Sequence, residues 1–154
     1  MNAIRKRDLL KSVLVLAVTC LTLVGFAGSA RADNVISGTL STHLVSCPTL
    51  CTSGTISGSF SGTFDYAMAT MTPTADPNVV ILTGTFVITT ATGTVTGTDT
   101  TIWDTSTGVF TDLGRFTGGT GSYANANGKI AIIGNFDIVA GTGQSNYAGK
   151  LVTN

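Results

Sequence analysis

The sequence predicts an all-β protein, a small antiparallel β-barrel of six to eight strands, with a β-sandwich as the alternative. Apolar and polar residues alternate with a period of two through most of the chain after residue 33. That region contains 26 Thr and 17 Gly, which favour pleated sheet over long helices. Turn signals recur about every 8–12 residues, and no amphipathic helical window is longer than a turn or two. A barrel is favoured because it leaves no exposed sheet edge.

An export signal is expected in residues 1–32. Four basic residues precede a mostly apolar run from Val13 to Phe26, and Ala30-Arg31-Ala32 has the small residues of a cleavage site. The run is shorter than the roughly 20 residues of a membrane span, so cleavage is expected to leave no span. Residues 33–154 would then be periplasmic or secreted. An uncleaved anchor, a lipoprotein at Cys20 and twin-arginine export remain as alternatives.

Removing this leader changes the charge balance. Residues 33–154 contain seven Asp, no Glu and three basic residues, Arg115, Lys129 and Lys150, which give a net charge of −4. Their length suits one domain with its own core. Nucleic acids and anionic membranes attract clustered Lys and Arg, so neither is expected as a partner.

The strands follow from the alternation, beginning with one at about Val35 to Val45. From Ile56 to Met68 the apolar residues share one face, which predicts one long strand or two joined at a glycine bend. Pro73 and Pro77 place a loop at residues 72–78. Later strands are expected at residues 79–88, 94–103, 109–117, 129–138 and 147–152. Glycines expected in the interior, where they allow tight coiling, are residues 58, 62, 84, 97 and 134.

Cys47 and Cys51 are the two cysteines left after cleavage, and an oxidising compartment predicts a disulfide between them. Two alternatives remain open. His43 extends the pair to His-x3-Cys-x3-Cys, a pattern that suits a soft metal. The Cys-Pro-x-x-Cys run also resembles that of thioredoxin-fold copper-delivery proteins, which leaves redox catalysis as the other alternative, but those proteins need a βαβ setting that this sequence does not show. The simplest expectation for His43 is a surface position near a strand end.

No catalytic residue and no cofactor are predicted. His43 is the only histidine and no serine occurs in a nucleophile-elbow pattern, so a serine-type triad is not expected. Asp65, Asp99 and Asp112 lie on expected strands, where Asp ordinarily faces solvent, and a catalytic Asp pair is the alternative. Two further carboxylates are expected to bond turn backbone: Asp76 and Asp104. Gly119 to Ala124 formally fits a dinucleotide motif, but a turn signal rather than a helix follows it.

Five aromatic residues are candidates for lining a ligand cavity: Phe60, Phe64, Tyr66, Phe86 and Trp103. Small barrels can hold one small ligand. The alternative role of these side chains is to fill the barrel.

The segment from Phe116 to Tyr123, continuing to Ala126-Asn127-Gly128, resembles the allene oxide cyclase and dirigent barrel superfamily. Those proteins carry Gly-Gly-Thr-Gly, a basic residue, an aromatic, and then Ala-x-Gly before the next strand. The matching positions are Gly118, Gly119, Thr120, Gly121, Tyr123, Ala126 and Gly128. Ser122 replaces the basic residue.

The resemblance implies an eight-stranded barrel with an interior cavity, often in a dimer or trimer. The cyclases isomerise a fatty-acid epoxide with the help of a glutamate, and this chain contains no glutamate. Dirigent proteins steer radical coupling with Asp, Arg and Tyr, and none of those positions can be matched residue by residue. Only the fold is therefore carried over.

The function expected from the sequence is an exported barrel without a catalytic site that binds a small apolar ligand or a protein partner. One alternative is a cyclase- or dirigent-like enzyme with Asp and Tyr inside the barrel. The other is a structural or surface-associated protein, which the Thr- and Gly-rich strands suggest.

Overall fold

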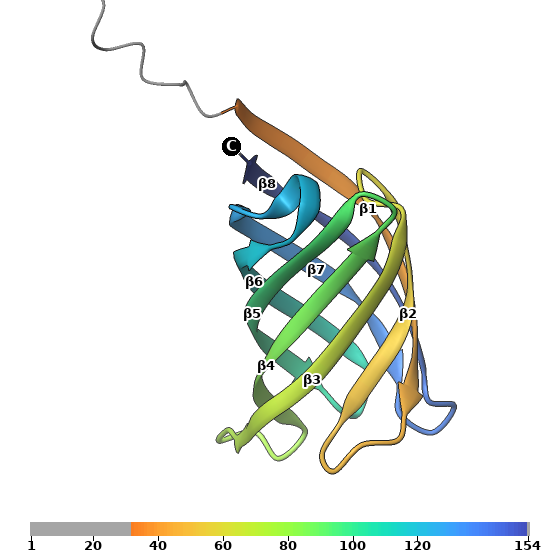
Figure 1. Ribbon diagram of the computed structural model, residues 1–154. Coiled ribbons are helices and arrows are strands. Elements are labelled where there is room, and N and C mark those ends of the chain that lie inside the picture. Colours follow the sequence, from red (N-terminus) through yellow and green to blue (C-terminus); the bar gives the residue numbers. More distant parts are fainter. Residues whose placement is uncertain (1–31, 154) are drawn as a thin grey trace, which may run out of the picture. The chain divides into compact units, whose positions relative to one another are not determined.

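The computed structural model describes residues 32–153, which form a closed barrel of eight antiparallel strands (Figure 1). The strands are β1 (Ala32–Val45), β2 (Cys51–Gly58), β3 (Gly62–Pro73), β4 (Val79–Thr90), β5 (Gly93–Asp104), β6 (Val109–Gly119), β7 (Asn127–Asp137) and β8 (Thr142–Thr153). Each strand pairs with the next, and β8 pairs with β1. The predicted barrel is thus confirmed and the sandwich is not the fold. The expected leader lies outside the described residues except for Ala32, which begins β1.

Several strands are longer than the alternation predicted. The stretch from Ile56 to Met68 is two strands, which separate where Gly58 takes a φ of +108° that favours glycine. β8 begins at Thr142 rather than Tyr147. Its first residues, Thr142 to Ser145, lack apolar side chains, yet they pair with β1 and β7 along their whole length. Backbone pairing on both sides makes this segment a strand without an apolar signal.

Alternate side chains of every strand point into the barrel and form its core. Glycine makes room there for large aromatic rings. A Cβ at Gly84 would overlap the ring of Tyr66, and one at Gly97 would overlap the ring of Phe86. Two of the glycines expected in the interior are therefore required by close packing.

The two ends of the barrel are built differently (Figure 1). The disulfide end carries the four loops of residues 46–50, 74–78, 105–108 and 138–141. The η1 end carries the turns of residues 59–61 and 91–92 and the 3-10 helix η1 (Gly121–Tyr123).

Phe60 fills the η1 end. Its side chain is 1% exposed and packs against the rings of Phe116, Tyr123 and Tyr147 with centroids 6.0–6.2 Å apart. Its backbone N–H donates a hydrogen bond of 3.0 Å to the Tyr147 hydroxyl. The turn that carries Phe60 is also hydrogen-bonded to β1, through Ser59 and Ser37. An aromatic plug therefore fills this end.

Candidate functional site

The barrel contains a cavity of about 90 Å³ toward the disulfide end. Half of the side chains around it are apolar: Leu40, Leu50, Phe64, Leu82, Phe110, Ile132 and Phe136. The other half carry polar atoms: Thr42, Thr52, Tyr66, Thr101, Trp103, Asp112 and Ser145. Leu50 belongs to the disulfide loop, so this loop contributes to the wall. The arrangement suits a ligand with an apolar body and at least one polar group.

A pair of carboxyl groups lies inside the barrel at this cavity. Asp112 on β6 lines the cavity, and Asp99 on β5 lies beside it; each side chain is only 6% exposed. Asp112 is opposite Thr101 in the β5–β6 ladder, and Asp99 is opposite Gly114, so the two carboxylates are diagonal neighbours on the inner face. The expectation that both face solvent was wrong.

The sequence contained a signal for these positions. Asp99 shares its face with Val95 and Trp103, and Asp112 shares its face with Phe110 and Phe116. The period of two therefore places both carboxylates inward once the aromatic face is recognised as the core face. The expectation of exposed carboxylates followed the general preference of Asp for solvent instead of this alternation. Asp65 does lie exposed, where it accepts a hydrogen bond of 2.6 Å from the Ser53 hydroxyl.

Burial raises the pKa of both carboxyl groups. Desolvation is the largest cause for each, and the charge of Asp99 adds to the effect at Asp112. The pKa of Asp99 rises to about 6 and that of Asp112 to about 8. The two groups also influence each other's pKa, so they titrate as a pair.

Several buried polar atoms at the cavity lack a hydrogen-bond partner. The Tyr66 hydroxyl and the Trp103 Nε1 are buried without a hydrogen bond, as are both oxygens of Asp99 and Oδ1 of Asp112. Burial, followed by the charges of Asp99 and Asp112, raises the pKa of Tyr66, so this side chain keeps its proton as a donor. Unpartnered buried polar atoms are rare in folded proteins, and several around one cavity favour a binding site.

The five aromatic candidates separate into two groups. Phe64, Tyr66 and Trp103 line the cavity. Phe60 is the plug of the η1 end. Phe86 is deeper in the core, stacked on Phe64 at 5.8 Å and edge-on to Phe116 at 6.0 Å. The cavity thus involves three of the five candidates and, in addition, Asp112, which was not proposed as a ligand-binding residue.

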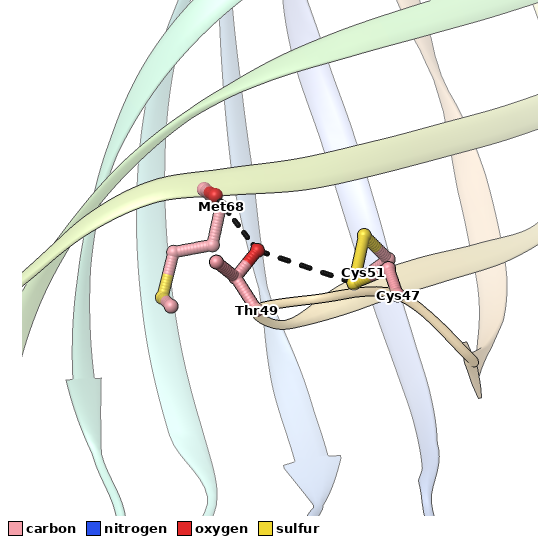
Figure 2. Close-up of a disulfide and its surroundings, with 4 residues drawn as sticks. All are labelled: Cys47, Thr49, Cys51 and Met68. Atoms are coloured by element: carbon pink, nitrogen blue, oxygen red, sulfur yellow. Dashed lines mark hydrogen bonds between the residues drawn. A yellow bond between two sulfur atoms is a disulfide. The ribbon is translucent and has the colours of Figure 1, made fainter.

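Cys47 and Cys51 form a disulfide in the loop between β1 and β2, as the sequence predicted (Figure 2). The Thr49 hydroxyl, between the two cysteines, donates a hydrogen bond of 3.1 Å to the Met68 carbonyl. The Met68 N–H in turn donates one of 2.9 Å to the Leu50 carbonyl. These bonds attach the loop to β3 and hold Leu50 at the cavity.

The remaining candidates occupy ordinary positions. His43 is exposed near the end of β1, as expected. Asp76 and Asp104 accept backbone hydrogen bonds of 2.9 Å within their turns, as expected. The Gly119 to Ala124 segment contains only the three-residue helix η1 before β7 begins. Among residues 32–153, no group of three metal-ligating side chains is close enough to hold a metal ion.

Comparison with known proteins identifies no family. No family model matches the chain, and no curated protein matches it. None of the helices in the described part of the chain is long and apolar enough to cross a membrane. The geometry of the cavity is therefore the basis for a functional assignment.

Proposed function

We propose that this protein binds one small, mostly apolar molecule in the cavity at the disulfide end of its barrel. The observation that supports the proposal is an apolar cavity with unpartnered Tyr66, Trp103 and Asp112 atoms in its wall. A ligand with a hydrogen-bonding group would satisfy these atoms and relieve the free-energy cost of their burial.

The size of the cavity limits the ligand. An engineered protein cavity of roughly 150 Å³ accepts benzene, and the space here is about 90 Å³. The buried part of the ligand is therefore expected to have about six non-hydrogen atoms or fewer. Any larger part would extend past Leu50 toward solvent.

Thermal unfolding with a panel of small alcohols, amines and ketones tests this proposal. A ligand that binds only the folded state raises the melting temperature, and the shift grows with the logarithm of its concentration above Kd. Ser145→Leu, which fills the cavity with apolar atoms, should remove the shift, whereas Asn146→Leu on the exposed face of the same strand should not. The proposal fails if no member of the panel shifts the wild-type transition.

A second candidate function is general acid catalysis on a small molecule in the same cavity. The observation in its favour is the carboxyl pair, because a buried acid that keeps its proton near neutral pH is suited to proton transfer. This arrangement has the Asp and Tyr inside the barrel that the cyclase- or dirigent-like alternative requires. The eight-stranded barrel is also what the resemblance to that superfamily implies, but a fold alone does not determine a function.

Hydrolysis of ethyl vinyl ether tests this second candidate, because its slow step is protonation of carbon by a general acid. Catalysis should require Asp112 and should decline as the pH rises through the raised pKa of the pair. Asp112→Asn should reduce the rate by about 100-fold or more, with Asp65→Asn as the matched control. A wild-type rate no faster than the buffer reaction would exclude this activity.

A further inference from the structure

We propose that the ligand is a small organic cation, a short alkyl or cycloalkyl amine whose ammonium group pairs with Asp112 and Asp99 inside the barrel. This inference rests on the proposed binding function and names the chemical class of the ligand. It is carried by the charge and hydrogen-bonding capacity of the cavity wall.

The first argument is the charge of the interior. Two carboxyl groups lie inside, whereas the basic side chains between residues 32 and 153 all lie on the exposed outer face: Arg115, Lys129, Lys150 and His43. A buried carboxylate without a positive partner is unfavourable, and proteins ordinarily pair such a charge. Since no described side chain supplies that positive charge inside the barrel, a ligand is the available source.

The second argument is the count of acceptors. Asp99 Oδ1, Asp99 Oδ2 and Asp112 Oδ1 are buried and accept no hydrogen bond. A primary ammonium group has three N–H donors and no acceptor, which matches this set. An alcohol brings one donor, so it would leave most of these oxygens unpartnered.

The third argument is the aromatic lining. The rings of Phe64, Tyr66 and Trp103 line the same cavity as Asp112. Aromatic faces attract cations in sites shielded from water. The apolar side chains around them, including Leu40 and Leu82, suit a short hydrocarbon body. The cavity therefore combines a place for the charge with a place for the alkyl group.

Matched ligands test the inference on the full-length wild-type protein. Isopentylamine and isopentanol have nearly the same shape and differ in charge, and cyclopentylamine and cyclopentanol form a second pair. By isothermal titration at pH 7, each amine should bind at least about tenfold more tightly than its alcohol. Asp112→Asn should remove this preference, and the exposed Asp65→Asn should preserve it.

The outcomes separate the two proposals. If the alcohols bind as tightly as the amines, the cation assignment is wrong and small-molecule binding stands. If neither class binds, and the wider panel of ligands also gives no thermal shift, the binding function itself is wrong. The comparison within the wild-type protein needs no variant, so poor folding of Asp112→Asn would not prevent a decision.

Discussion

At the scale of single residues, the carboxyl groups of Asp99 and Asp112 make the stability of the barrel depend on pH. Burial raises both pKa values above the ordinary Asp value of 3.8, so the folded protein binds more protons than the unfolded chain in that interval. The stabilisation is fully present below about pH 4. It is lost as the pH rises through the raised values, toward about 8.

Unfolding by urea at several pH values measures this effect. We expect the wild-type free energy of unfolding to fall by several kcal/mol between about pH 4 and pH 8 because of the pair. Asp112→Asn should flatten the dependence, and Asp65→Asn should not. Parallel pH profiles for wild type and Asp112→Asn would contradict the assignment of the effect to this pair.

At the scale of residues, the sequence predicted which strands carry the two carboxyl groups better than it predicted their contact. The strands that carry Asp99 and Asp112 were predicted, and the parity of their neighbours points inward. The contact between the two carboxyl groups depends on the β5–β6 register, which places Asp99 opposite Gly114 and Thr101 opposite Asp112. The length of the turn between the two strands sets this register, and a sequence pattern locates strand ends only to within a few residues, so the pair could not be predicted from spacing.

Among the elements, the loop between β1 and β2 is stabilised by its disulfide. Replacing Cys47 and Cys51 by Ser should lower the free energy of unfolding by about 2 kcal/mol, because the bridge restricts a short loop of the unfolded chain. The far-ultraviolet circular dichroism should be unchanged, since the eight strands remain paired. Equal stability of the oxidised protein and the double variant would show that the bridge contributes nothing.

The turn between β2 and β3 depends on its aromatic plug. Phe60→Ala should destabilise the barrel by about 3–5 kcal/mol, because it leaves a cavity beside Phe116, Tyr123 and Tyr147. Ser61→Ala, at the exposed next position of the same turn, is the control and should change stability by less than about 0.5 kcal/mol. A small effect of Phe60→Ala in denaturant unfolding would argue against the plug.

Element order and type followed well from the alternation, whereas the plug did not. Phe60 lies in phase with Ile56 and Phe64, so it was expected to line a cavity on a strand. The reversal between β2 and β3 instead places it over the end of the barrel. The φ of Gly58 that permits this reversal is a property of the backbone, and a sequence pattern indicates only that a glycine could adopt it.

For the whole molecule, the closure between β1 and β8 brings distant parts of the chain together. Ala32 pairs with Thr153, so the two ends of the described chain are neighbours in one ladder. A circular permutant that joins residues 153 and 32 through a short Gly/Ser linker and opens at residues 138–141 should therefore fold to the same barrel. Its circular dichroism should match the parent, and its unfolding should stay cooperative; an unfolded permutant would contradict the adjacency.

The seam between β1 and β8 also affects how the chain can fold. The first strand finds one of its two partners only after the last strand is present, and the paired residues are about 100 to 120 positions apart in the sequence. Such high contact order slows folding, because the entropy of a long loop is lost before its contacts form. Until β8 arrives, β1 and β7 each have an unpaired edge that can bind other chains. Pairing of β8 with β1 and β7 therefore removes these unpaired edges, and with them this route to aggregation.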